Sequence, residues 1–252
     1  MIARVTFAET RSELTKLARL PGYVIPTLAF PLAFYAAFGL AFGGTRGFGA
    51  TTVATYMLAT YGAFGVVGCA LFGFGVSVAV ERGQGWLLLK RASPMPPAAY
   101  ILAKIFTSMT FAAVVVLLLC VAGAAFGGVR LAPATWLLLL VSLVLGAVPF
   151  CALGLAIGSI AGPNSAPALV NLVYLPMSFA SGLWIPIEQL PPAIAHVAPF
   201  LPTYHLGQMA LGALGYGHGS VTTHVLALLA WAVAGAALAA YGLRRDEGKT
   251  YG

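Results

Sequence analysis

Residues 131–187 read LAPATWLLLLVSLVLGAVPFCALGLAIGSIAGPNSAPALVNLVYLPMSFASGLWIPI, a stretch without a single charged side chain. A helix needs about 20 apolar residues to cross the roughly 30 Å hydrocarbon layer of a membrane, so this stretch is too long for one crossing and must contain a turn. The turn is supplied by Gly162-Pro163-Asn164-Ser165. Proline disfavours the helical conformation in its predecessor, and Asn and Ser are good helix caps. We therefore predict that one transmembrane helix covers 134–160, ending near Ile160, and that the next covers 166–183, beginning near Ala166.

The rest of the chain has a similar composition. Of its 252 residues, 60% are hydrophobic and 8% are charged, whereas soluble domains carry about a quarter charged residues, so a water-soluble fold is excluded. Further uncharged stretches long enough to cross a membrane lie at 21–42, 56–80, 105–126 and 221–241. The predicted fold class is therefore all-α: a single polytopic membrane domain over 1–252 with six transmembrane helices.

Lysine and arginine are distributed unevenly among the segments that join these helices. Positive residues accumulate on the cytoplasmic side of membrane proteins. The segments assigned outside hold Arg46 and Arg130, and those assigned to the cytoplasm hold Arg4, Arg11, Lys16, Arg19, Arg82, Lys90, Arg91, Lys104, Arg244, Arg245 and Lys249. Both termini are therefore predicted to be cytoplasmic. The net charge of +7 then reflects topology rather than a nucleic-acid partner, because no aromatic platform is interleaved with the basic residues.

Residues 1–20 predict an amphipathic helix that lies on the inner membrane surface. Phe7, Leu14 and Leu17 share one helical face, and the charged residues lie largely away from it: Glu9, Arg11, Glu13 and Lys16. A frayed, solvated terminus is the alternative. On the other side of the membrane, residues 184–220 form the predicted outer loop. Prolines at 186, 191, 192, 199 and 202 preclude one continuous helix there, although short helical pieces such as 193–197 are compatible with them.

The cytoplasmic loop over 81–104 predicts a second short amphipathic helix. Its apolar run 86–89 follows two glycines and is closed by Lys90, Arg91 and Pro94. Basic residues favour a helix C-terminus, and proline discourages continuation. Four exposed apolar residues need a partner, which is either the membrane surface or a groove in another protein.

The predicted spans contain no Asp, Glu, Lys or Arg. Carriers driven by an ion gradient usually place such groups within the membrane, so this class of transporter is disfavoured. His224 lies in the last span near its outer end, where an interfacial polar residue is favoured over a proton carrier. The chain also lacks the G-x-x-x-x-G-K-[ST] phosphate loop, metal-ligand spacing and a nucleophile with a base in reach. We expect no catalysis and no resident cofactor or metal, and any ATP hydrolysis must occur in another polypeptide.

Small and uncharged polar residues are spread through the spans. Candidates for lining a substrate path are Ser77, Thr107, Thr110, Asn171, Tyr174 and Ser178. Hydrogen bonding between helices is their alternative role. Glycine pairs with a packing spacing indicate contact with a second subunit: Gly39/Gly43, Gly123/Gly127 and Gly154/Gly158. The three cysteines, Cys69, Cys120 and Cys151, lie in apolar runs and are interpreted as small packing residues.

Three patches of sequence resemble one known family. Residues 17–21 lead into 31–34 like a surface helix that enters a first span, and 81–94 place an acid and glycines before a leucine-rich turn and Ser-Pro. Residues 181–191 and 199–204 are similar to an outer re-entrant segment before the last span. This family is the ABC type-2 (ABC-2 type) permeases, the membrane subunits of bacterial exporters. An arginine that its members often carry after the last patch is missing from 204–208.

The resemblance implies a permease subunit in the bacterial cell (inner) membrane, in contact with lipid and paired with a second permease subunit as a homodimer or heterodimer. Two cytoplasmic ATPase subunits, which bind ATP and Mg²⁺, would drive it. By position, the resemblance assigns the ATPase contact to Glu81, Arg82, Gly83, Gly85, Trp86, Leu88, Leu89, Lys90, Arg91 and Pro94. It assigns the outer re-entrant segment to Gly182, Pro186, Glu188, Pro191 and Pro202. The uncharged spans favour export of a hydrophobic or amphiphilic substrate, such as a drug or lipid. A gradient-driven carrier or channel and a membrane scaffold are the alternatives.

The predicted topology places the 184–220 loop outside the cell. A cysteine introduced into this loop is expected to react with a membrane-impermeant thiol reagent on intact cells. Labelling that occurs only after lysis would contradict the predicted orientation.

Overall fold

The computed structural model describes residues 2–43, 46–48, 51–93 and 95–247 of an all-α chain. The chain begins with α1 (Ile2–Ala18). A continuous helix follows, built from α2 (Pro21–Val24), η1 (Ile25–Ala29), α3 (Phe30–Phe34) and η2 (Tyr35–Leu40), and then the short strands β1 (Arg46–Phe48) and β2 (Thr51–Thr52). A second continuous helix is built from α4 (Val53–Ala70), η3 (Leu71–Val76) and α5 (Ser77–Gly83), and α6 (Trp86–Ala92) and α7 (Pro97–Ala125) complete the first half of the chain. Its second half contains α8 (Pro133–Leu145), α9 (Ala147–Ile160), α10 (Ala166–Ala180), η4 (Ile187–Gln189), α11 (Pro192–Val197), η5 (Ala198–Phe200), α12 (Pro202–Ala213) and α13 (Val221–Glu247).

Five helices in the described residues are long and apolar enough to cross a membrane: Pro21–Leu40, Val53–Gly83, Pro97–Ala125, Pro133–Ile160 and Val221–Arg245. The all-α membrane fold is therefore confirmed. The sixth apolar helix, α10, has 15 residues and covers most of the predicted span 166–183. The number of crossings thus depends on α10.

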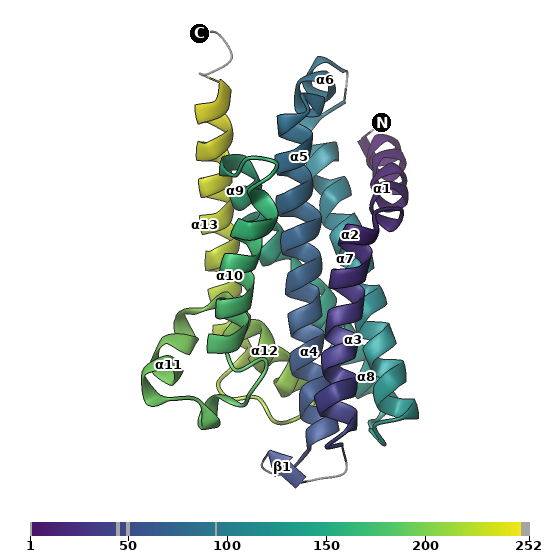
Figure 1. Ribbon diagram of the computed structural model, residues 1–252, viewed down its shortest axis with the longest axis vertical. Coiled ribbons are helices and arrows are strands. Elements are labelled where there is room, and N and C mark those ends of the chain that lie inside the picture. The colour runs from purple at the N-terminus through teal and green to yellow at the C-terminus, as the bar shows by residue number, and fades with distance from the viewer. Residues whose placement is uncertain (1, 44–45, 49–50, 94, 248–252) are drawn as a thin grey trace.

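The helices form one elongated bundle (Figure 1). The helix Val53–Gly83 is the most buried of the five, since 78% of the residues in its most apolar segment are buried inside the protein. The described ends of α1 and α13 lie at the same end of the bundle as α6, and β1 and α11 lie at the opposite end (Figure 1). The segments predicted to be cytoplasmic therefore share one end of the molecule.

Two helices extend further than the predicted spans and contain charged residues. Helix α5 ends at Gly83, and α7 begins at Pro97 rather than near 105. Proline suits the first helical position, so the helix starts there and runs through Lys104. Glu81, Arg82 and Lys104 consequently lie within long helices, just beyond the predicted spans 56–80 and 105–126.

The turn predicted near 162–165 is present. Helix α9 ends at Ile160 and α10 begins at Ala166. Between them, the Gly162 amide donates a hydrogen bond of 3.1 Å to the Ser165 Oγ. The Gly-Pro-Asn-Ser sequence was therefore sufficient to find the break in an uncharged stretch, although the Ser165 hydroxyl bonds within the turn and does not cap α10.

Small residues allow α9 to pack closely against helices on two sides. A Cβ at Gly158 would lie 2.6 Å from the Gly75 carbonyl oxygen of η3, and one at Gly154 would lie 3.1–3.2 Å from backbone and side-chain atoms of the same region. On the other side, a Cβ at Gly235 of α13 would lie 2.9 Å from the α9 backbone. The Gly154/Gly158 pair, expected to mark contact with a second subunit, is used within the chain.

The other two glycine pairs also pack within the chain. Tyr35 accounts for most of these contacts, because its hydroxyl lies 2.9–3.0 Å from the Cβ positions of Gly123 and Gly127 and its ring lies 2.6 Å from that of Gly39. Gly43 faces backbone oxygens of its own helix and the Ala54 Cβ. A side chain at these positions would displace Tyr35, whose side chain is fully buried.

The packed face of α1 differs from the predicted one. Its buried residues are Thr6, Glu13 and Leu17, whereas Phe7 is 72% exposed. Glu13 was expected on the polar face, but it turns inward because its basic partners Lys104 of α7 and Lys90 of α6 lie there. Helix α1 therefore packs on the bundle through a face that contains a carboxylate.

The close approach of α9 and η3 predicts that Gly158→Ala is destabilising. The added methyl group would overlap the backbone of Gly75, so we expect a loss of about 1–3 kcal/mol in the free energy of unfolding. Gly212→Ala is the matched control, because a Cβ there meets nothing within 4 Å. Thermal unfolding of the detergent-solubilised protein would measure both. Equal stability of the two variants would contradict the packing described here.

Candidate functional site

The junction of α5 and α6 forms a tight turn at the end of the bundle that also holds the described ends of α1 and α13 (Figure 1). Gly85 has φ +75°, a left-handed conformation that favours glycine, and the next residue begins α6. Gly83 packs against the α9–α10 turn, where a Cβ would lie 2.6 Å from the Pro163 ring. The turn therefore requires glycine at both positions, for the left-handed backbone at Gly85 and for the close contact at Gly83.

Arg82 holds the end of α9. Its guanidinium donates hydrogen bonds of 2.6 Å to the Ser159 carbonyl and 2.5 Å to the Ala161 carbonyl. Carbonyls at the end of a helix lack partners within the helix and attract positive charge. Arg82 thus ties α5 to α9 and directs its guanidinium inward.

Lys104 is the centre of a buried ionic cluster. Its side chain is 1% exposed, and its ammonium lies 3.0 Å from carboxylate oxygens of both Glu13 and Glu81. It also donates to the Ser77 Oγ at 2.9 Å. Because an unpaired buried charge costs several kcal/mol, these three partners are needed to hold Lys104 in the bundle.

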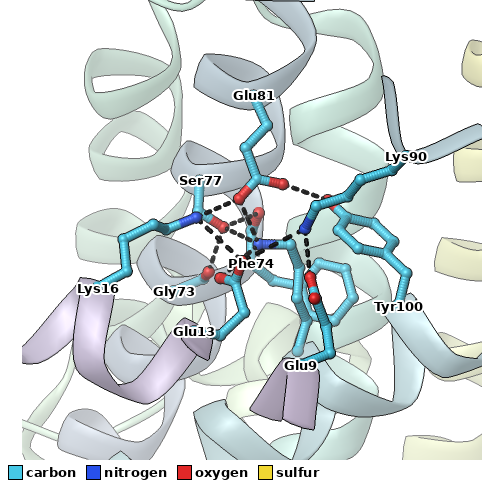
Figure 2. A network of polar contacts seen from close by, with 10 residues as sticks. Glu9, Glu13, Lys16, Gly73, Phe74, Ser77, Glu81, Lys90 and Tyr100 are labelled. Atoms are coloured by element: carbon cyan, nitrogen blue, oxygen red, sulfur yellow. Dashed lines mark hydrogen bonds and ion pairs between the residues drawn. The ribbon is translucent and has the colours of Figure 1, made fainter. Parts of the chain in front are cut away.

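Glu81 is shared among several elements. One carboxylate oxygen binds Lys104. The same oxygen binds Lys16, and the other accepts a 2.7 Å hydrogen bond from the Tyr100 hydroxyl (Figure 2). Glu81 is 6% exposed. The residue predicted to touch an ATPase is therefore committed to contacts inside the chain.

Residues of α1 and α6 complete the cluster. Lys16 binds Glu13 at 3.1 Å, and Lys90 forms an ion pair with Glu9 and lies 3.5 Å from Glu13 (Figure 2). The Lys90 ammonium also lies 4.5 Å from the centre of the Tyr100 ring, within cation–π range. Through Lys90, α6 is joined to α1.

The charges of this cluster balance, since three carboxylates face three ammonium groups. Burial alone would lower the pKa of Lys16, but the Glu81 and Glu13 carboxylates outweigh it and raise that pKa above its ordinary value. Lys16 is therefore an ammonium ion at neutral pH. A balanced set of paired charges reduces the cost of bringing them into a low-dielectric interior.

A cavity of about 600 Å³ opens beside the cluster, between α1 and the helix that contains η3 and α5. Its polar lining includes Glu9, Lys16 and Ser77, and its apolar lining includes Phe72 and Trp86. The cavity thus combines charged and hydrophobic side chains. This combination suits an amphiphilic molecule.

The residues assigned to ATPase contact divide into two groups. Trp86 and Leu89 of α6 are 54% and 68% exposed, while Leu87 is partly buried against the core. Glu81, Arg82 and Lys90 bind partners within the chain, as described above. Leu88 and Arg91 lie in α6, but their side chains are outside the described part of the structure, as is all of Pro94. The apolar surface available to another protein is therefore centred on Trp86 and Leu89.

The candidates for a substrate path are dispersed. Ser77 lines the cavity, and the Tyr174 hydroxyl donates to the Phe64 carbonyl at 2.8 Å. Thr107 and Ser178 are buried without a hydrogen-bond partner for their hydroxyls. The remaining two, Thr110 and Asn171, are exposed. The structure brings Ser77 into the cavity and leaves the others on separate parts of α7 and α10.

The outer segment has four of its predicted positions at bends. Gly182 has φ +78°, and Pro186, Pro191 and Pro202 lie at or beside the first residues of η4, α11 and α12. The Glu188 carboxylate lies 3.3 Å from the exposed His218 ring. These positions end and restart short helices.

Helix α12 packs into the bundle and contains a polar pair that the sequence did not indicate. Its buried face contacts α4, α8 and α13. On that face, His205 lies 3.0 Å from His224 of α13, measured between their Nδ1 atoms. His224 therefore has a defined side-chain partner within the chain.

The ionic cluster was missed because its members are far apart in the sequence. Glu13 and Lys104 are separated by 91 residues, and Lys16 and Glu81 by 65. One signal was available: the chain has only six acidic residues, and charged groups that are rare in a membrane protein tend to be paired or functional. Within the described residues, no group of three or more His, Cys, Asp or Glu side chains could hold a metal ion.

Comparison with known proteins gives two matches. The model of the family described as "ABC-2 type transporter" matches residues 4–214. A relative from Bacillus subtilis (strain 168), the "Putative transport permease YvfS", is 26% identical over 236 residues, which cover 94% of this chain and 96% of the relative. The matched region includes the ionic cluster, α6 and α12.

The environment of Lys104 predicts a strong effect of Lys104→Met on stability. The variant leaves Glu13 and Glu81 without their most buried partner, and we expect a loss of about 3–5 kcal/mol in the free energy of unfolding. Lys16→Met is the matched control: Lys16 contacts the same two carboxylates, but its side chain is 40% exposed, so the expected loss is about 0–1 kcal/mol. Denaturant unfolding in micelles would compare them. Similar losses of stability in the two variants would show that the burial of a lysine does not determine how much it contributes to the stability of the cluster.

Proposed function

Because the chain belongs to the ABC-2 type transporter family and is a transporter membrane subunit, we propose that it is the permease of an ATP-driven exporter whose ATP is hydrolysed by a separate chain. The match over residues 4–214 carries this proposal. The relative named as a transport permease supports it over nearly the full length of both chains. ATP and Mg²⁺ would bind to the partner ATPase rather than to this chain.

Helix α6 is the proposed contact with the ATPase. It presents Trp86 and Leu89 to the surroundings at the end of the bundle where the described ends of α1 and α13 lie (Figure 1). Exposed aromatic and aliphatic side chains on a short helix are typical anchors for a groove in a partner. The membrane surface is the alternative partner for this apolar face.

The contacts of α6 give it two mechanical connections to the transmembrane helices. Through the glycine turn it continues into α5, and through the Lys90–Glu9 ion pair it is joined to α1. Glu81 and Lys104 then link α5 to α7. In the proposed mechanism, a displacement of α6 by the ATPase moves these helices together.

The proposed topology has six crossings, with α10 as the shortest. Its 15 residues span about 22 Å at 1.5 Å per residue, less than the roughly 30 Å hydrocarbon layer, so adjoining residues would have to complete the crossing. An even number of crossings would place both termini on one side, and the position of the described ends of α1 and α13 at one end of the bundle supports this (Figure 1). The excess of Lys and Arg makes that side the cytoplasm of a bacterial cell. Helix α12 would then be a re-entrant element on the outer side.

The proposed substrate is hydrophobic or amphiphilic and moves outward. The combined charged and apolar lining of the cavity beside α1 supports this class. Apolar side chains on the outward faces of α7, α8 and α13 are exposed in the single chain, among them Val121, Leu137 and Val233. They provide surface for lipid and for the second permease subunit that the proposal includes.

One observation favours a different transporter class. Ionisable residues buried in helices that cross a membrane often serve ion-coupled carriers, and Glu13, Glu81 and Lys104 are buried together. In vesicles that contain the chain and a candidate ATPase, transport that requires ATP and survives a proton ionophore supports the exporter. Transport abolished by the ionophore and indifferent to ATP would identify a gradient-driven carrier.

The proposed contact predicts that Trp86→Asp combined with Leu89→Asp lowers co-purification of the ATPase at least about tenfold, since a charge in place of each anchor removes the apolar contact. Phe7→Asp is the matched control, because Phe7 is also exposed on a helix at this end of the bundle. Membrane insertion of both variants is measured in parallel. Full retention of the ATPase by the α6 variant would refute the contact.

A further inference from the structure

The two histidines between α12 and α13 are fixed at both ring nitrogens. His205 and His224 are 7% and 5% exposed, and their Nδ1 atoms lie 3.0 Å apart. The His205 Nε2 lies 2.9 Å from the Pro199 carbonyl oxygen, and the His224 Nε2 lies 2.7 Å from the His218 carbonyl oxygen. Each ring therefore faces a carbonyl on one side and the other imidazole on the other side.

Counting protons on these rings gives a mismatch for the neutral pair. A carbonyl oxygen can only accept, so both Nε2 atoms must carry a proton to make their hydrogen bonds. The Nδ1···Nδ1 contact then needs a third proton, whereas two neutral imidazoles have two in total. A neutral pair would leave two lone pairs facing each other at one of the three contacts, which is unfavourable in a buried site.

A fourth proton is also disfavoured. It would place two N–H groups head to head across 3.0 Å and two positive charges in adjacent rings. Burial and the neighbouring His224 lower the pKa of His205, while its hydrogen bond to Pro199 raises that pKa; the net direction is down, which shifts uptake of the third proton, as well as of the fourth, to lower pH. The pair is thus satisfied by three ring protons and one positive charge.

In the part of the chain that the structure describes, the elements packed around the pair supply no buried carboxylate that would neutralise this charge. The ring centre of Tyr204 lies 5.4 Å from that of His205 and 6.2 Å from that of His224. The Glu188 carboxylate pairs with the exposed His218 ring. Its negative charge also interacts electrostatically with Tyr204 and with Tyr56 of α4. Helix α8 and η5 carry no titratable side chain, and Tyr61 of α4 and Tyr174 of α10 contact Phe34 and Phe64.

We infer that His205 and His224 form a binding site for one proton, held between their Nδ1 atoms, and that this proton ties α12 to the first turn of α13. The inference is independent of what the chain transports. As pH falls, uptake of the third ring proton completes the hydrogen bonds and strengthens the contact between the two helices. At still lower pH a fourth proton breaks the Nδ1···Nδ1 contact, so the strength of the contact passes through a maximum.

Ring ¹⁵N NMR of the purified chain in micelles tests the site directly, because the sequence has only four histidines. Between pH ~8 and ~5, the range in which imidazoles titrate, the pair is expected to take up one proton in a joint step, with one shared and strongly deshielded Nδ1 proton. Two rings that titrate independently near the ordinary value of about 6.5 would overturn the inference. A metal ion at one equivalent per chain, removed by a chelator together with the joint signal, would overturn it as well.

Hydrogen exchange of α12 amides provides a second readout. In the wild type, the protection factors of these amides, which are corrected for the intrinsic pH dependence of exchange, are expected to be about tenfold higher where the pair holds one charge than at higher pH, the effect of one charge-assisted hydrogen bond. His205→Asn and His224→Asn should each abolish this pH dependence. His196→Asn is the matched control, since His196 is exposed and contacts the Pro192 carbonyl of its own helix. Loss of the pH dependence in the control as well, or its persistence in both pair variants, would contradict the assignment.

Discussion

Lys104 needs two carboxylates to remain buried, and this requirement determines how the end of the bundle that holds α6 is assembled. Its ammonium cannot reach water, so Glu13 and Glu81 must approach it from α1 and α5. Once they do, α1 is held on the bundle rather than lying free on a membrane, and the cavity forms beside α1. Lys90 and Tyr100 extend the same set of contacts to α6. The candidate functional surface thus rests on one buried cation.

Close packing of small residues is the second constraint, and it acts in the middle of the bundle. Gly75, Gly158 and Gly235 let three helices approach so closely that little side-chain volume remains between them. Packing of this kind drives helix association in lipid, where the hydrophobic effect between helices is weak. Glycine in helix interiors costs helical propensity, and in this chain the cost is offset by contacts that no larger residue allows. The ionic cluster therefore stabilises the end of the bundle that holds α6, and the glycine contacts stabilise its middle.

Local features of the structure were predictable from the sequence, and features that join distant segments were not. The turn before Ala166 and the short helix from Trp86 to Ala92 depend on cap residues, glycines and prolines that stand next to each other in the chain. The buried face of α1 could not be predicted from periodicity, because Glu13 turns inward to partners that lie on other helices. Counting uncharged residues also predicted spans that stop at 80 and begin at 105, whereas α5 continues to Gly83 and α7 begins at Pro97, since paired charges do not stop a helix. The histidine pair joins α12 to α13 and required a three-dimensional structure to be seen.

The separation of 91 residues between Glu13 and Lys104 has a consequence for biosynthesis. Helix α1 leaves the ribosome long before α7, so its carboxylate has no buried partner while the first two long helices are being inserted. Until Lys104 arrives, Glu13 is more stable in water or among lipid headgroups than in the bundle. Docking of α1 is therefore a late step, which follows the insertion and assembly of the first three long helices.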